Sequence, residues 1–252
     1  MKKLLFLLPL LAIISCTNSD NPNDAQFNNS GCLKCDNYTA GETFMIDGIR
    51  YEVANKAMLL TAIVGGDDLT KYCTSKIMDM SALFSGAYDF NQNISTWDVS
   101  NVTDMSRMFY DAESFNQDIG NWDVSNVTDM SAMFVYAKSF NQSIGDWDVS
   151  NVTDMSTMFS TAISFNQNIG NWDVSNVADM SAMFIDAESF NQDIGNWAVS
   201  NVTDMSYMFA SATAFNQDLT QWCVTQVATM PDLFSTNSGL SASNHPVWGT
   251  CP

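Results

Sequence analysis

The stretch that decides the fold is MSRMFYDAESFNQDIGNWDVSNVTD, residues 105–129, which repeats along the chain with a period of 25 residues and no insertion. A fixed period of this length predicts a solenoid, in which each unit forms one coil and the core runs along the axis. Such long, regular surfaces usually bind partners and seldom catalyse. Further copies begin at Met80 (partial), Met130, Met155, Met180, Met205 and Met230 (degenerate).

The apolar pattern within one unit predicts its local structure. Spacing from Met105 to Ala112 favours a short helical turn that Asp104 caps. Segments 115–119 and 124–127 suit short extended strands, with Gly120 at the tight turn between them. The repeated apolar positions are Met105, Met108, Phe109, Ala112, Phe115, Ile119, Trp122, Val124 and Val127.

Stacked coils place equivalent residues above one another at about 4.8 Å, so seven coils would span about 35 Å. The Asn116-Gln117 pairs then form hydrogen-bonded ladders along the axis. Aromatic columns hold the register of the stack. The expected columns contain Phe115, Phe140 and Phe165, and Trp122, Trp147 and Trp172.

The N-terminus has the features of a lipoprotein signal. Lys2 and Lys3 precede a short apolar run, and Ile13-Ile14-Ser15-Cys16 resembles a bacterial lipobox, in which the cysteine is lipidated. Thr17 follows the cysteine, a residue compatible with transfer to the outer membrane. A plain secretory signal is the alternative. We expect a lipid anchor on Cys16 at the bacterial cell surface.

The chain divides into five segments. They are a signal peptide (1–15), a flexible tether (16–30), an N-terminal cap (31–79), the repeat solenoid (80–234) and a C-terminal cap or tail (235–252). In the N-terminal cap, Asp47-Gly48 predicts a hairpin turn. Asn55 can cap a helix that stops at Gly65-Gly66. Pro231 suggests that regular stacking stops in the last coil.

Five cysteines remain once Cys16 is lipidated, and disulfides are expected outside the cytoplasm. Cys223 and Cys251 flank the last coil, and we expect them to pair. Two of Cys32, Cys35 and Cys73 are expected to pair, with Cys73 as one partner. No further His or Cys lies near them, which argues against a zinc site.

The formal charge is −19, and from Met80 onward the only Lys or Arg residues are Arg107 and Lys138. Nucleic acid binding needs Lys and Arg opposite the phosphates, so this acidic solenoid is not expected to bind it. The acidity is consistent with solubility at the cell surface.

The motifs WDVSNVTDMSxMF and FNQDIxxW resemble the BspA-like leucine-rich repeat surface proteins, in the branch first described as a mycoplasma lipoprotein repeat. The resemblance covers about residues 68–234. It implies an LRR-like parallel β-solenoid on a bacterial surface, with roles in adhesion or partner binding and no catalytic residues to transfer. The chain departs from the pattern at Ala178, Ala198 and Pro231.

Two kinds of polar or variable positions are candidates for function. Stacked carboxylates could bind calcium or act in glycosidic chemistry, but each Asp can instead cap its own coil, which we favour because every coil carries it. His245 is the only histidine and is expected to be an ordinary tail residue. The acidic columns are Asp104, Asp129, Asp154, Asp179 and Asp204, and Asp98, Asp123, Asp148 and Asp173.

Three positions vary between copies and are expected to point outward beside the Met-Phe turn. This exposed stripe is a candidate contact surface, with neutral variation as the equal alternative. Its candidate binding residues are Arg107, Tyr110, Tyr136, Ile185 and Tyr207. The full set is Arg107, Ala132, Thr157, Ala182 and Tyr207; Tyr110, Val135, Ser160, Ile185 and Ala210; and Asp111, Tyr136, Thr161, Asp186 and Ser211.

The sequence therefore predicts a non-enzymatic, lipid-anchored surface protein that binds an extracellular protein or glycan. No cofactor and no metal are expected. The alternatives are a carbohydrate-active β-solenoid enzyme that uses the ladder carboxylates, and a passive surface stalk. The even distribution of acids over the coils argues against the enzyme, since an active site would be unique.

Overall fold

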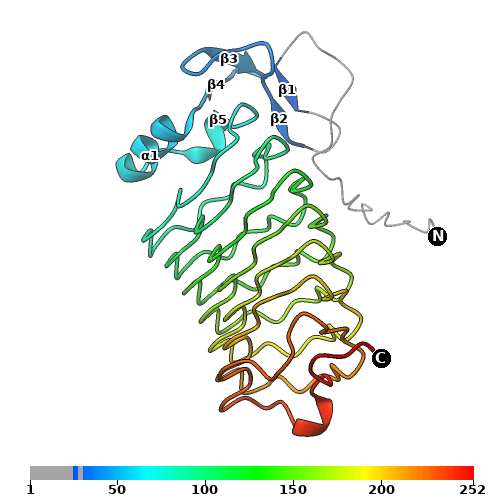
Figure 1. The fold of residues 1–252 in the computed structure, drawn as a ribbon. Helices are drawn as coiled ribbons and strands as arrows, with labels where there is room; N and C mark the ends of the chain where they lie inside the picture. Colours follow the sequence, from blue (N-terminus) through cyan, green and yellow to red (C-terminus); the bar gives the residue numbers. More distant parts are fainter. Residues whose placement is uncertain (1–24, 28–30) are drawn as a thin grey trace, which may run out of the picture.

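A computed structural model describes residues 25–27 and 31–252. The chain is a repeat solenoid: coils of 25 residues stack along one axis, with an N-terminal cap at one end and the C-terminal segment at the other (Figure 1). One hydrophobic cluster runs from Ala54 in the cap to Leu240 in the last segment. The core is therefore continuous along the axis.

All the β-strands that the structure describes lie in the N-terminal cap except Gln26–Phe27, a strand within the segment 16–30 that the sequence predicts to be a flexible tether. Strands β1 (Gln26–Phe27) and β2 (Leu33–Lys34) pair antiparallel. Strands β3 (Thr43–Ile46) and β4 (Ile49–Val53) form the expected hairpin, and β5 (Tyr72–Cys73) pairs parallel with β4. The hairpin turn has positive φ at Asp47 (51°) and Gly48 (79°), as the Asp-Gly sequence predicts.

Helix α1 (Lys56–Gly65) follows the hairpin and covers the open end of the first coil with Leu59 and Ala62. The side chain of Asn55 accepts a hydrogen bond from the backbone N–H of Met58 and caps the helix. Gly66 ends it in the left-handed conformation at φ 73°. The short 3₁₀ helix η1 (Leu69–Lys71) leads into β5.

The coils do not contain the helical turn and strands that the sequence predicts. Residues 105–112 form consecutive tight turns, because Arg107 (φ 56°) and Asp111 (φ 60°) are left-handed and interrupt any helix. The Met108 N–H bonds to Met105 O in its own coil, whereas the Arg107 N–H bonds to Ser131 O in the next coil. Backbone N–H groups in this segment thus bond alternately to a carbonyl of their own coil and to a carbonyl of the next coil.

Segments 115–119 and 124–127 are likewise turns and irregular backbone, not strands. The coils make only isolated parallel bridges, which join successive Asp residues from Asp79 to Asp204. In these two segments side chains supply hydrogen bonds between the coils. The side-chain amide of Asn126, for example, donates to Ser100 O of the preceding coil at 2.7 Å.

Left-handed residues that are not glycine destabilise the coils, and the first coil carries Gly86 (φ 74°) where later coils carry other residues. We expect Thr161→Gly (φ 58°) to raise the free energy of unfolding by about 0.5–1 kcal/mol, because a β-branched residue is strained there. Ser160→Gly, at a neighbouring position without positive φ, should lower it by about 0.5–1 kcal/mol. Denaturant titration measures both, and equal signs would contradict the conformational argument.

Aromatic columns form the core, as expected. Phe115, Phe140 and Phe165 stack with centroid separations of 5.8 and 6.0 Å. A second column, which includes Phe109 and Phe134, interleaves with it, so that Phe109 and Phe115 lie 3.9 Å apart. The repeated indole N–H groups from Trp122 to Trp222 also bond to the preceding coil, for example Trp147 Nε1 to Ile119 O at 3.1 Å.

The Asn-Gln ladder is present too. The Asn116 side-chain oxygen accepts from the Asn141 N–H at 3.0 Å and from the Gln142 amide at 2.9 Å, and the pattern repeats in later coils. Gly120 and its equivalents lie in a turn, as expected, but the reason for glycine there is close packing. Gly120 has no positive φ, but a Cβ there would lie 2.5 Å from Ser143 O, so glycine permits close approach of the next coil.

Regular stacking ends at Pro231, as the sequence suggests. The Asp bridges stop at Asp204, and the left-handed positions shift by one residue, to Leu233 and Asn237. Phe234 then meets the end of the column edge-on, 5.4 Å from Phe209. The segment, which includes η2 (Ala242–Asn244), is held by the expected disulfide between Cys223 and Cys251.

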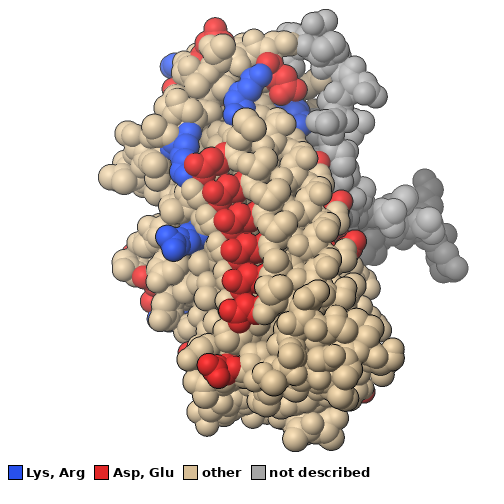
Figure 2. Space-filling view, viewed as in Figure 1, with Lys and Arg blue, Asp and Glu red and all other residues tan. Residues whose placement is uncertain are grey.

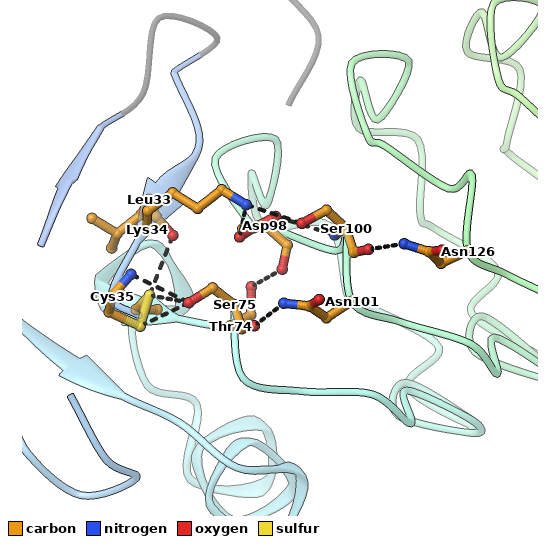
Figure 3. A network of polar contacts seen from close by, with 10 residues as sticks. Leu33, Lys34, Cys35, Thr74, Ser75, Asp98, Ser100, Asn101 and Asn126 are labelled. Atoms are coloured by element: carbon orange, nitrogen blue, oxygen red, sulfur yellow. Dashed lines mark hydrogen bonds and ion pairs between the residues drawn. A yellow bond between two sulfur atoms is a disulfide. The ribbon is translucent and has the colours of Figure 1, made fainter. Parts of the chain in front are cut away.

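The N-terminal cap is joined to the first coil by a buried polar network (Figure 3). Lys34 Nζ lies 2.7 Å from Asp98 Oδ2, with side-chain exposures of 8% and 0%. It also donates to Ser100 Oγ at 3.0 Å. Cys35 and Cys73 form a disulfide beside this pair, as the sequence predicts for Cys73.

Candidate binding surface

The variable stripe presents several side chains to solvent. Arg107 is exposed, Tyr136 and Tyr207 are 41% and 40% exposed, and Tyr110 and Ile185 are half-buried. The left-handed conformation at Arg107, Tyr136 and Tyr207 lets the backbone N–H bond along the axis to the next coil. The backbone N–H groups of these three exposed residues are therefore all hydrogen-bonded within the solenoid.

Not every stripe position points outward as expected. Ala132, Val135 and Ala210 are buried, at 9%, 6% and 7% exposure. The accessible part of the stripe is thus discontinuous, and its large exposed side chains concentrate in the second and third coils.

Three of the candidate binding residues come together in those two coils. The Tyr110 and Tyr136 rings meet edge-to-face at 6.2 Å, and the carbonyl of Arg107 accepts a hydrogen bond from the Tyr110 N–H. Ile185 and Tyr207 lie in the fifth and sixth coils, so they do not join this cluster. Tyr207 is three coils from Tyr136, or about 14 Å at strand spacing.

A neighbouring column extends the cluster. Tyr88, Glu113 and Lys138 occupy successive coils, and Lys138 Nζ lies 2.7 Å from Glu113 Oε1. The hydrogen bond that Lys138 donates to Glu113, followed by the charges of Glu113 and Asp111, raises the pKa of Lys138. Tyr88 is 55% exposed. Sequence comparison of the full copies missed it, because it belongs to the partial first copy.

We call Tyr88, Arg107, Tyr110, Tyr136 and Lys138 the tyrosine patch. It holds both basic residues of the solenoid from Met80 onward and three aromatic side chains. Arg107 forms no ion pair among the described residues. Tyrosine and arginine are the residue types that most often dominate binding energy, since they combine apolar area with directed hydrogen bonds.

The acidic columns serve the fold. Asp104 Oδ1 accepts the Ser106 N–H at 2.8 Å, and the same turn recurs at Asp129, Asp154, Asp179 and Asp204. Figure 2 shows acidic residues as an unbroken line along one face of the solenoid. The expected helix-capping role is therefore replaced: each Asp accepts the Ser N–H within a turn, and no helix follows it.

Hydrogen bonds stabilise the charged form of several of these carboxylates. Bonds from the Ser175 hydroxyl and N–H lower the pKa of Asp173. Partial burial works against ionisation of Asp79, but bonds from Lys56 and Ser81 lower its pKa overall. In the described part of the chain, no group of three or more His, Cys, Asp or Glu side chains is arranged to hold a metal ion.

His245 is not an ordinary tail residue. It packs edge-on against Phe234 at 5.8 Å, and its Nε2 lies 3.1 Å from Ser235 Oγ. Burial lowers its pKa. The ring therefore helps to close the C-terminal end of the core, next to Trp248.

The expected lipidation site, Cys16, lies outside the described residues. Within residues 25–27 and 31–252, no helix has the length and apolar character needed to span a bilayer.

The stacked coils, their two caps and their polar ladders define a repeat solenoid with a discrete aromatic patch. The chain belongs to the family described as Mycoplasma protein of unknown function, DUF285, whose model matches twice, over residues 55–161 and 142–248. The two matches together span the helix of the N-terminal cap and all the coils. Comparisons with curated proteins and with solved structures gave no match.

Proposed function

We propose that the protein is a lipid-anchored cell-surface protein whose solenoid binds an extracellular protein or glycan without catalysis. The observation that carries this proposal is the tyrosine patch. The patch is chemically unlike the rest of the solenoid, which exposes mainly Asp, Asn, Gln, Ser and Thr.

The other polar groups support a binding role by elimination. The Asp turns, the Asn-Gln ladder and the indole N–H groups all bond to the coils themselves and repeat along the stack. A site that discriminates a partner needs side chains that differ from coil to coil, because identical coils offer identical contacts. Arg107, Tyr110 and Tyr136 meet that requirement.

The finer assignment to BspA-like leucine-rich repeat surface proteins is part of the same proposal. It rests on the WDVSNVTDMSxMF and FNQDIxxW motifs, and the mycoplasma family of the repeat is consistent with it. Placement at the outer membrane rests on the lipobox-like Ile13-Ile14-Ser15-Cys16 and on Thr17.

Replacement of the lipidated residue tests the anchor. We expect Cys16→Ala to yield unprocessed or soluble protein, because neither cleavage nor acylation of a lipoprotein signal proceeds without the cysteine. Membrane fractionation and metabolic labelling with a fatty acid measure the result, with the wild type as control. Processed, membrane-bound Cys16→Ala protein would contradict the anchor.

Removal of the patch tests the binding surface. Once an array of glycans and extracellular proteins has identified a ligand for the detergent-solubilised protein, the triple change of Arg107, Tyr110 and Tyr136 to Ala should abolish binding. Stability should change by about 0.5 kcal/mol or less per exposed site. Binding and far-UV circular dichroism are measured together.

The matched control replaces Asp129, Asp154 and Asp179 by Asn. The three positions lie on the acidic face. The introduced Asn side chains keep an oxygen that can accept the Ser N–H, so this variant should bind normally. Binding that survives loss of the patch but not loss of the acidic face would assign the ligand to the acidic column instead.

A further inference from the structure

Helix α1 is apolar around its whole circumference, yet one side of it has no partner in the described chain. Its sequence, KAMLLTAIVG, carries polar side chains only at Lys56 and Thr61. Leu59 and Ala62 face the core, whereas Leu60 is 41% and Val64 is 90% exposed. A helix that is apolar all round is normally buried on all sides.

An open groove of about 400 Å³ begins where α1 begins. Ala54, Ile77 and Met78 supply its apolar wall, and Met78 is 62% exposed. Lys56 and Lys76 flank it, with Lys56 paired to Asp79 at 2.8 Å. We call α1 and this groove the α1 face. It combines exposed apolar groups with ammonium groups at its border.

Charge changes systematically with distance from the α1 face. The N-terminal cap, residues 31–79, carries five basic and seven acidic residues, whereas residues 80–252 carry two basic and nineteen acidic ones. The basic residues of the cap are Lys34, Arg50, Lys56, Lys71 and Lys76. The acidic column begins at Asp79, beside the groove, and runs away from the cap (Figure 2). From residue 139 to the C-terminus the chain has no Lys or Arg. Anionic lipid would therefore repel the coils more strongly than the cap.

The covalent connection places this end of the molecule near the proposed anchor. Nine peptide steps separate Cys16 from Ala25, the first described residue. A chain of that length reaches at most about 32 Å. Tethering over such a distance gives a high effective concentration, so a weak surface contact is populated once the anchor is in place.

We propose that the α1 face lies against the lipid surface, with Leu60, Val64 and Met78 in the interfacial region. This inference rests on the proposed lipid anchor at Cys16. Apolar side chains enter the boundary between headgroups and acyl chains, while Lys56 and Lys76 remain among the headgroup phosphates. The acidic coils then stand away from the bilayer and present the tyrosine patch to the exterior.

The test uses the full lipidated chain with a nitrobenzoxadiazole fluorophore at Val64→Cys, and a matched control labelled at Val247→Cys. Val247 is 65% exposed and lies in the C-terminal segment, at the far end of the stack. Cys35–Cys73 and Cys223–Cys251 are disulfides and Cys32 is fully buried, so labelling of the folded protein without reductant is directed to the exposed new thiol. The probes are read on vesicles of phosphatidylcholine with phosphatidylglycerol.

We expect the label at position 64 to shift to the blue and to become protected from an aqueous quencher on vesicles, while the label at 247 remains unchanged. No shift at 64 in protein that floats with the vesicles would overturn the contact and leave the anchor intact. Protein that fails to float would overturn the anchor itself. A shift without vesicles that grows with protein concentration would mean that a second copy covers the α1 face.

Discussion

Asp98→Ala should lower the free energy of unfolding by about 3–5 kcal/mol, because it leaves the Lys34 ammonium buried without its counter-charge. The Asp98 side chain is fully buried, Lys34 is 8% exposed, and the two charged groups lie 2.7 Å apart. The change also removes the acceptor of the Ser100 N–H. Equilibrium denaturation in urea, with the disulfides intact, measures the loss.

Asp148→Ala is the matched control for this prediction. Asp148 occupies the same column two coils later and accepts from the Ser150 N–H and hydroxyl, but it is exposed and pairs with no lysine. Its loss should lower stability by about 1 kcal/mol, the value of a hydrogen bond at an accessible site. Equal effects at Asp98 and Asp148 would show that the buried ion pair contributes nothing particular.

A second variant separates the ion pair from the contact between cap and coil. Lys34→Met combined with Asp98→Leu replaces both charges by apolar side chains, which is often neutral where removal of one partner is not. We expect the double variant to recover most of the stability lost in Asp98→Ala. If the double variant is no more stable than Asp98→Ala, the stability lost in Asp98→Ala comes from the packing of the side chain and not from its charge.

The period predicts the solenoid and its columns, because every coil repeats the same side chains at the same depth. Phe115 and Phe140 stack, and Asn116 bonds to the next coil, for that reason. The conformation inside the coil does not follow from the period. Apolar residues at i, i+3 and i+4 suit a helix, but two left-handed residues per coil give the same inward spacing through consecutive tight turns.

Contacts between distant segments left no local signal in the sequence. Asp98 has the same neighbours in the repeat as Asp123, and only Lys34, 64 residues earlier, makes it a buried ion-pair partner. The patch could be predicted in part, since Arg107, Tyr110 and Tyr136 differ visibly between copies. Tyr88 could not, because the first copy is incomplete, and Val135 is buried although the pattern of the repeat places it outward.

Trp147→Ala should have an effect as large as that of the buried ion pair, but on the middle of the stack. Trp147 is 3% exposed, stacks 6.5 Å from Trp172 and donates to Ile119 O. Its removal leaves a large cavity and a buried carbonyl without its donor, a loss of about 3–5 kcal/mol. Coils contact only their neighbours, so this loss weakens the coupling between the two halves of the solenoid.

We therefore expect denaturation of Trp147→Ala to separate into two transitions, one for each half, where the wild type shows one. Hydrogen exchange resolves the halves, since amides on either side of the third coil should then open at different denaturant concentrations. Trp147→Phe retains a ring and loses the indole N–H, so it should cost less and preserve a single transition. If Trp147→Ala still unfolds in one step with a loss under about 1 kcal/mol, the tryptophan column does not couple the coils.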